Sequence, residues 1–220
     1  MASDLQIEIE VEQQAQNRIL LNEVTPDYNA VTEPNGWGYP PNPTRADIYT
    51  ADPVNAPAAL VNITFPDATS VTINAISATT PLYVIGVDAV YNPFEILPTM
   101  AGMGSDDTPF PDGKYSIELQ VSGLYGNNLP QDSFQSQATA ILYCYSQVEC
   151  CVNNLYTAAG GSCDDCNNKK LAYAQQADGW LSVLKAAINC GKWAKADEAL
   201  AILQELCNSN EGGCGGCSGC

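Results

Sequence analysis

The chain lacks histidine altogether and is poor in basic residues. It has 220 residues, with 8 Lys and Arg against 25 Asp and Glu, and its formal net charge is -17. Without histidine, neither a Ser–His or Cys–His nucleophile pair nor a His-ligated catalytic zinc site can be built. The scarcity of cations argues against binding nucleic acid through its phosphates and against docking on anionic membranes. We therefore expect neither nucleic acid nor membrane as a partner.

Long apolar runs are missing as well. No uninterrupted apolar stretch is long enough to cross a bilayer, so a membrane-spanning helix is not expected. The first residues, MASDLQIEIEVEQQ, have neither a cationic start nor an apolar block, and they are not expected to act as a secretory signal. Because 45% of the residues are apolar, the chain can still bury a core. We expect it to be made and folded in a cytosol.

Two further absences divide the chain near Cys144. The first 143 residues contain no cysteine and all ten cysteines follow, whereas every one of the 14 prolines lies at or before Pro130. Acidic residues outnumber basic ones by 17 to 3 before Cys144 and by only 8 to 5 from there onward. This change predicts a β-sandwich domain over 1–143, a helical region over 144–208 and a Gly/Cys-rich tail over 209–220.

The first region is predicted to consist of short β-strands. Apolar and polar residues alternate at its start, which is typical of a half-buried strand whose solvated face carries Glu8, Glu10 and Glu12. The expected strands cover residues 5–12, 60–65, 70–76, 115–122 and 133–143. Turns rich in Pro, Asp and Gly are expected at 66–69 and 111–113. This pattern predicts an antiparallel, Ig-like β-sandwich, and without βαβ alternation a parallel sheet is disfavoured.

The second region is predicted to be α-helical, which places the whole chain in the α+β class. A short helix is expected over 147–156, a long one over 167–189 and a third over 192–207. The apolar stripe of the long helix consists of Leu171, Ala174, Ala177, Leu181, Leu184 and Ile188. Cys190 and Gly191 supply a stop after it, so the last two helices are expected to form an antiparallel hairpin.

The late cysteines are the strongest candidate for a site. Cys163-Asp-Asp-Cys166 is one CxxC motif, and Cys214-Gly-Gly-Cys217-Ser-Gly-Cys220 holds two overlapping CxxC spacings. A CxxC motif lets two thiolates bind one tetrahedral metal ion, and the expected helical hairpin returns the chain toward the first motif. We therefore predict a structural zinc site made of Cys163, Cys166 and two of the three tail cysteines.

Two alternatives stay open for the cysteines. The same residues can form disulfides if the protein leaves the cytosol, or they can stay free thiols. Cysteines on the faces of strands and helices are candidates for small buried apolar groups, namely Cys144, Cys150, Cys151, Cys190 and Cys207. A thioredoxin-type redox role is disfavoured because no βαβ unit surrounds a CxxC motif.

Two loops offer weaker candidates. Trp37 and Tyr39 lie among glycines and prolines, and they either bind a partner or fill one end of the sandwich core. Asp106, Asp107 and Asp112 share a Gly/Pro-rich loop, but calcium takes about six or more oxygen ligands. A solvated turn is the preferred interpretation of these three carboxylates, because Asp and Gly favour turns.

Several motifs follow one another in a distinct order along the chain. They are PNGWGYPPNP from Pro34, ADI from Ala46, the Pro66-Asp67 hairpin, PDGKY from Pro111, the Cys-Cys helix, CDDC, CGK from Cys190 and the Gly/Cys tail. This order is similar to that of small virion structural proteins of crAss-like tailed bacteriophages. The resemblance implies a non-enzymatic component of the neck, tail or capsid surface, made in the host cytoplasm and located in the virion. Copies of itself and other virion proteins are the implied partners, and no catalytic residues are assigned.

Two other classes of function remain as alternatives. A stand-alone acidic binding or adhesion module would present Trp37 and Tyr39 to a ligand and would stay monomeric. A metal-dependent hydrolase would need an open coordination position for water, which an all-cysteine site rarely offers.

Overall fold

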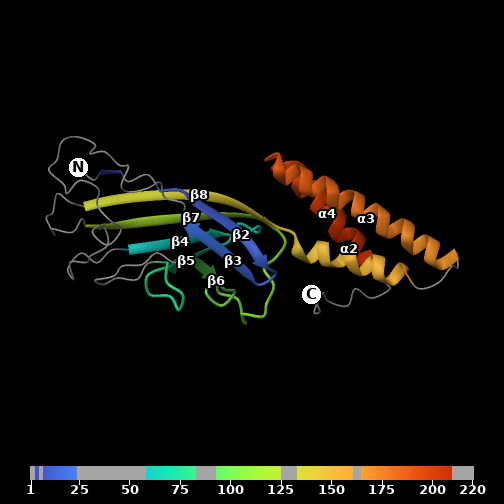
Figure 1. The fold of residues 1–220 in the computed structure, drawn as a ribbon, viewed down its shortest axis with the longest axis horizontal. Coiled ribbons are helices and arrows are strands. Elements are labelled where there is room, and N and C mark those ends of the chain that lie inside the picture. Colours follow the sequence, from blue (N-terminus) through green and yellow to red (C-terminus); the bar gives the residue numbers. More distant parts are fainter. Residues whose placement is uncertain are drawn as a thin grey trace. The chain divides into compact units, whose positions relative to one another are not determined.

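A computed structural model of the chain describes residues 3–4, 7–23, 58–82, 93–124, 133–160 and 165–209. Within these ranges two β-sheets precede three helices, so the protein belongs to the α+β class (Figure 1). The chain divides into two compact units. The β unit comprises Met1–Thr108 and Tyr115–Leu142, and the helical unit comprises Pro109–Lys114 and Tyr143–Cys220. The sequence had not indicated that the short segment 109–114 belongs with the helices.

The larger sheet has five strands among the described residues. In spatial order they are β1 (Ser3–Asp4), β8 (Ser133–Cys144), β7 (Gly113–Leu124), β4 (Ala58–Thr64) and β5 (Ser70–Asn74). β4 pairs antiparallel with β5, as the turn pattern predicted, and also with β7, which the sequence did not indicate. β1 pairs parallel with β8, which the sequence did not indicate. More than 100 residues separate β1 from β8, which is long enough for the connection that two parallel strands need.

The smaller sheet contains β2 (Ile9–Ala15), β3 (Arg18–Glu23) and β6 (Phe94–Ile96), all antiparallel. β2 confirms the predicted strand over residues 9–12 but begins and ends later than the predicted 5–12, and its glutamates are exposed. β3 and β6 were missed. β3 carries a run of three aliphatic residues instead of a clear alternation, and β6 is only three residues long. The sheet brings them together through the pairs Ile19–Ile96 and Leu21–Phe94.

Each sheet buries one of its faces. In the larger sheet Val61 and Ile63 of β4 lie opposite Leu119 and Ile117 of β7, and all four side chains are fully buried. The smaller sheet buries Ile19, Leu21, Phe94 and Ile96 to the same degree. Because successive residues of a strand point to opposite faces, these alternating positions form continuous apolar surfaces. Their burial accounts for the regular spacing of apolar residues in the first region.

The turn between β4 and β5 forms where the sequence predicted it. Asp67 Oδ1 accepts hydrogen bonds from the backbone N–H and the hydroxyl of Thr69, at 2.9 and 2.6 Å. Ala68 takes the left-handed conformation, with φ of 67°, and its N–H donates to the carbonyl of Phe65. The hydrogen bonds from Thr69 hold the pKa of Asp67 below its usual value. Asp favours turns because its side chain can form a hydrogen bond with the backbone two residues later.

Three helices make up most of the described helical unit: α2 (Ser146–Ala159), α3 (Asp165–Asn189) and α4 (Trp193–Ser209). They lie side by side in Figure 1, and α3 contacts both of the others. α3 ends before Gly191, whose φ is 63°. The N–H of Gly191 donates to the carbonyl of Ile188, and the N–H of Lys192 donates to the carbonyl of Ala187. These are the two bonds of a Schellman cap, so the predicted stop and hairpin are confirmed. The helices of the described part are too short or too polar to span a membrane.

The core of the helical unit is rich in alanine. Its buried residues are Tyr143, Val148, Cys151, Val152, Leu155, Ala174, Ala177, Leu181, Leu184, Ala187, Ala196, Ala199, Leu200 and Leu203. Most of the predicted α3 stripe is therefore confirmed. The prediction was wrong for Leu171, which is 39% exposed. Helical spacing identifies a face of a helix but not how far along its length a neighbouring helix covers it.

Candidate functional site

Most of the predicted site residues fall outside the part of the chain that the structure describes: Trp37, Tyr39, Cys163, Cys214, Cys217 and Cys220. Cys166 lies in α3, but its side chain is not among those described. The zinc site and the aromatic loop therefore stay predictions. Among the residues that are described, no group of three or more Cys, Asp or Glu side chains is placed to hold a metal ion.

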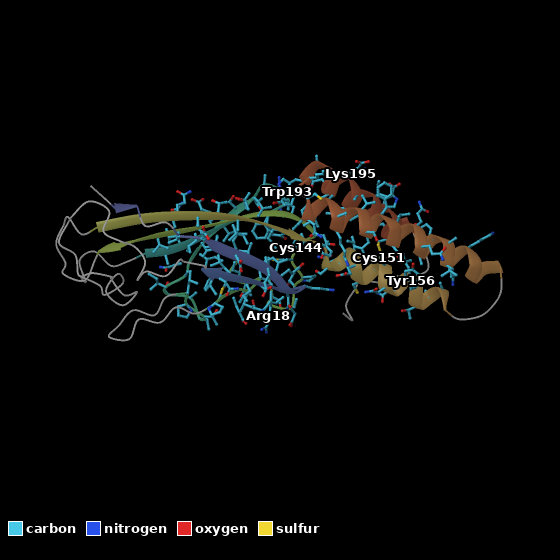
Figure 2. The ribbon with its side chains drawn as sticks, turned by 45° about the horizontal axis from the view of Figure 1, so that its top comes forward. Arg18, Cys144, Cys151, Tyr156, Trp193 and Lys195 are labelled. Carbon is cyan, nitrogen blue, oxygen red and sulfur yellow. A yellow bond between two sulfur atoms is a disulfide. The ribbon has the colours of Figure 1, made fainter. Side chains whose placement is uncertain are left out.

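A disulfide joins α2 to α4. Cys151 and Cys207 are bonded at an S–S distance of 2.06 Å with their Cα atoms 6.2 Å apart, although 56 residues separate them in sequence. Cys150 takes part in a disulfide as well. Cys150 and Cys151 are buried, as predicted, and Cys207 is partly buried, but the prediction for these three residues did not include their bonds. Figure 2 marks Cys151 on α2. Nothing in their local spacing indicated the bond, because it depends on the packing of two helices.

Cys144 and Cys190 are the free cysteines of the described residues, and they differ in environment. Cys144 is fully buried, as predicted. Burial, with a contribution from the Asp112 charge, raises the pKa of its thiol far above the usual value. Since the thiolate is the reactive form, Cys144 is an inert thiol. Cys190 is exposed at the end of α3, so the prediction that it is a buried apolar group was wrong.

Asp112 binds the first turn of α2. Its Oδ1 accepts the backbone N–H of Gln147 at 3.1 Å, and its Oδ2 accepts that of Val148 at 2.8 Å. Gln147 in turn donates its side-chain Nε2–H to the Phe110 carbonyl at 2.8 Å. The N-cap residue, Tyr145, provides no side-chain acceptor. Asp112 therefore supplies from a distant segment the acceptors that the first free N–H groups of a helix need.

This role corrects the interpretation of Asp112 as part of a solvated turn. Burial raises the pKa of its carboxyl, while the two N–H donors act in the opposite direction. The interpretation holds for Asp106 and Asp107, which are exposed. Asp106 accepts hydrogen bonds from the backbone N–H and hydroxyl of Thr99, which lower its pKa. Asp112 and Asp106 thus accept hydrogen bonds from different segments, Asp107 is exposed, and the three carboxylates do not form a common ligand set.

Polar side chains connect the three helices along their seams. Between α2 and α3, Lys185 forms an ion pair with Glu149 and lies 5.7 Å from the centre of the Tyr145 ring. Between α3 and α4, Tyr173 donates its hydroxyl to the Leu206 carbonyl at 2.8 Å. Tyr143, near the end of β8, donates its hydroxyl to Asp197 Oδ1 of α4 at 2.9 Å, which ties the strand end to the helices. These contacts fix the helices relative to one another within the unit.

A shallow hollow lies on the β unit. It has a volume of about 380 Å³ and is lined by Ile7, Glu8, Ile9, Glu10, Ala138 and Thr139. The lining combines the start of β2 with the middle of β8. Two exposed carboxylates at its rim would favour a cationic group over an anion. The alternating pattern predicted that Glu8 and Glu10 lie on a solvated face, but it contained no signal that β8 lies beside them.

Comparison with known proteins gave no relatives: no family model, no curated protein and no solved structure matches the chain. The function is therefore argued from the geometry of the described residues.

Proposed function

We propose that the protein is a non-enzymatic structural component of a tailed-phage virion, in a neck or tail ring or a similar assembly. Its partners would be copies of itself and other virion proteins, with neither nucleic acid nor membrane among them. The observation that carries the proposal is that polar and sulfur-bearing side chains of the helical unit bind other parts of the same unit. Asp112 binds a helix start, Tyr143 bonds Asp197, and Cys151 is bonded to Cys207. These contacts keep the helices of the unit in a fixed arrangement, and a docking element requires such a fixed arrangement.

The proposed fold of the β unit is an Ig-like sandwich. Each sheet has one continuous buried apolar face, which two packed sheets would share as a common core. The opposite face of β2 carries exposed Glu10 and Glu12, and such like charges discourage pairing with other strands. A sandwich with acidic outer faces fits a component that must stay dispersed before it is assembled.

The net charge of -17 sets a condition on assembly. Isolated copies repel one another at low ionic strength. Close packing therefore requires screening salt, divalent cations or a basic surface on the partner. Light scattering as a function of ionic strength tests this: we expect self-association to increase as salt rises from low values. Association that weakens over the same range would show that attractive ion pairs govern the contact.

The location of the protein decides the proposal. Mass spectrometry of purified particles should recover the chain in a fixed stoichiometric ratio to the major capsid protein, and a map of the intact particle should show its copy number and neighbours. Recovery only from the soluble fraction of infected cells, with none in particles, would reject the proposal.

A stand-alone binding module is the second candidate, and the hollow on the β unit favours it. Its acidic rim, with Glu8 and Glu10, suits a ligand that carries cationic groups. In this case the purified protein stays monomeric, and charge reversal at Glu8 and Glu10 abolishes ligand capture without unfolding the protein. Glu12→Lys is the matched control, because Glu12 is exposed on the same strand but does not line the hollow. The Trp37→Ala variant tests the aromatic loop in the same assay.

Structural zinc remains part of the proposal. Cys163 and Cys166 with two of Cys214, Cys217 and Cys220 would supply four thiolates for a closed tetrahedral site. Protein purified under reducing conditions should then contain about one zinc ion per chain, and a chelator should loosen the tail while the β unit stays folded. Well under one zinc per chain, with a melting curve that a chelator leaves unchanged, would reject the zinc site.

A further inference from the structure

The disulfide between Cys151 and Cys207 connects the two helices that contact each other least. α3 packs extensively on both α2 and α4, whereas the contact between α2 and α4 is the smallest of the three. Cys207 lies in the last turns of α4, beside Leu206, whose carbonyl accepts the Tyr173 hydroxyl. The covalent bond therefore holds the C-terminal end of α4 against α2, where noncovalent packing contributes least.

The two sulfur-bearing residues differ in their access to solvent. Cys151 is 3% exposed and belongs to the buried core of the helical unit. Cys207 is partly exposed and packs at the edge of that core. Thiol–disulfide exchange requires a thiolate to reach one sulfur along the line of the bond, so access decides which sulfur is attacked. A small thiol from solution meets Cys207 first.

We propose that Cys151 and Cys207 form a reversible thiol–disulfide exchange site that fixes α4 to α2 when a low-molecular-weight disulfide such as oxidised glutathione is present. The Cys207 thiolate attacks one sulfur of oxidised glutathione and releases one glutathione thiolate. The Cys151 thiolate then attacks the Cys207 sulfur of this mixed disulfide and releases the second. Two protein thiols are oxidised, one glutathione disulfide is reduced to two thiols, and the two protons end on glutathione.

The reduced form keeps its core. The apolar contacts of α3 with both neighbours do not depend on the bond, and both cysteines remain small apolar groups when reduced. Reduction therefore releases the end of α4, together with the hydrogen bond from Tyr173 to Leu206, without unfolding α2 or α3. In a reducing cytosol the open form is favoured, and the closed form follows exposure to an oxidising medium. Exchange at Cys151 and Cys207 does not require that the protein is a virion component.

The test uses the full-length chain in mixtures of reduced and oxidised glutathione. Trapping of free thiols followed by peptide mapping should show the Cys151–Cys207 bond appearing as the oxidised fraction increases. Tryptophan fluorescence of a Trp37→Phe variant reports on the helical unit alone, because the other two tryptophans, Trp180 and Trp193, lie in it. We expect its melting midpoint to fall by about 10 °C on full reduction, since a bond that closes a loop of 56 residues restricts the unfolded chain strongly.

Substitutions separate this bond from the other cysteines. The double variant Cys151→Ala with Cys207→Ala should melt below the oxidised chain and lose the part of the glutathione response that this bond supplies, while the separate disulfide of Cys150 keeps its own response. Cys190→Ala, which removes an exposed free thiol, is the matched control and should respond as the unsubstituted chain does. Peptide maps that pair Cys207 with a different cysteine, or a helical unit whose midpoint is the same in both redox states, would overturn the proposal.

Discussion

The β unit and the helical unit are stabilised in different ways. The β unit relies on backbone ladders and on large buried side chains, among them Tyr115, Phe94, Leu21 and Ile63. Among the described residues, five of the 14 in the buried core cluster of the helical unit are alanine. An alanine removes little apolar surface from water, because burial stabilises roughly in proportion to area. The helical unit supplements this smaller core with a disulfide, a carboxylate bound to a helix start and polar contacts between helices.

The difference explains the distribution of cysteine along the chain. A sheet whose apolar face is continuous gains enough from burial to need no covalent link, and the first 143 residues have no cysteine. Three helices with small core residues leave backbone groups without partners at their ends and bury less apolar area for each residue that they order. The two units should therefore respond to different perturbations, and hydrogen exchange followed by mass spectrometry can measure their stabilities separately.

The largest effect is expected from a truncation in the core of the β unit. Phe94→Ala removes a fully buried ring from β6, and we expect a loss of about 3–5 kcal/mol in the free energy of unfolding of that unit. The exposed residue Gln14 provides the control, because Gln14→Ala should change stability by less than about 0.5 kcal/mol. Equal destabilisation of both units by Phe94→Ala would show that they unfold together. The claim that the two units have separate stabilities would then be wrong.

Alkaline pH should weaken the helical unit in particular. Burial and the nearby Asp197 raise the pKa of Tyr143 far above its usual value of 10.0. An acid whose pKa is raised by folding binds its proton more tightly in the folded state, so the stability it contributes is complete below pH 10 and is lost as the pH rises beyond it. Ultraviolet absorbance above pH 10 measures the ionisation of the tyrosine, and hydrogen exchange over the same pH range measures the stability of the helical unit.

The variant Tyr143→Phe checks the assignment. It should be less stable than the unsubstituted chain at pH 7, because it loses the hydrogen bond to Asp197. As the pH rises above 10, its stability should decrease less than that of the unsubstituted chain, because the variant has no hydroxyl to ionise at this position. An unchanged alkaline profile in this variant would assign the effect to another group, with the Cys144 thiol as the next candidate, since burial raises its pKa as well.

A smaller effect is expected from removal of the acceptor at the start of α2. Asp112→Ala leaves the N–H groups of Gln147 and Val148 without their carboxylate, and we expect the helical unit to lose about 1–3 kcal/mol. Asp112→Asn keeps one acceptor oxygen, so the stability of its helical unit should lie between that of the unsubstituted chain and that of Asp112→Ala. The matched control is Asp107→Ala, which removes an exposed carboxylate from the same loop and should have little effect. Similar losses for Asp107 and Asp112 would contradict the capping role.

The smallest effect is expected from the ion pair between α2 and α3. Lys185→Gln removes the partner of Glu149, but both side chains are substantially exposed, so we expect a loss of only about 0.2–1 kcal/mol. The loss should shrink as salt screens the pair. Lys192→Gln, at an exposed lysine after α3, is the control. An effect of Lys185→Gln that exceeds that of Asp112→Ala would mean that surface charges, more than the helix start, stabilise this unit.

Most elements could be predicted because their signals are local. The alternation over 5–12 indicated β2, helical spacing indicated α3, and Gly191 marked the end of α3. β3 and β6 could not be predicted, because one lacks clear alternation and the other is too short to show a period. Their strand conformation comes from pairing with each other, which joins residues far apart in the sequence.

The candidate sites were harder to predict than the elements. The sequence by itself determined the division near Cys144, the acidic character of the first region and the helical hairpin, since each depends on composition or on spacing along one segment. Only the tertiary structure decided that Asp112 binds the start of α2 and that Cys151 pairs with Cys207. Both contacts depend on the distance between elements, and a local pattern of residues carries no information about that distance.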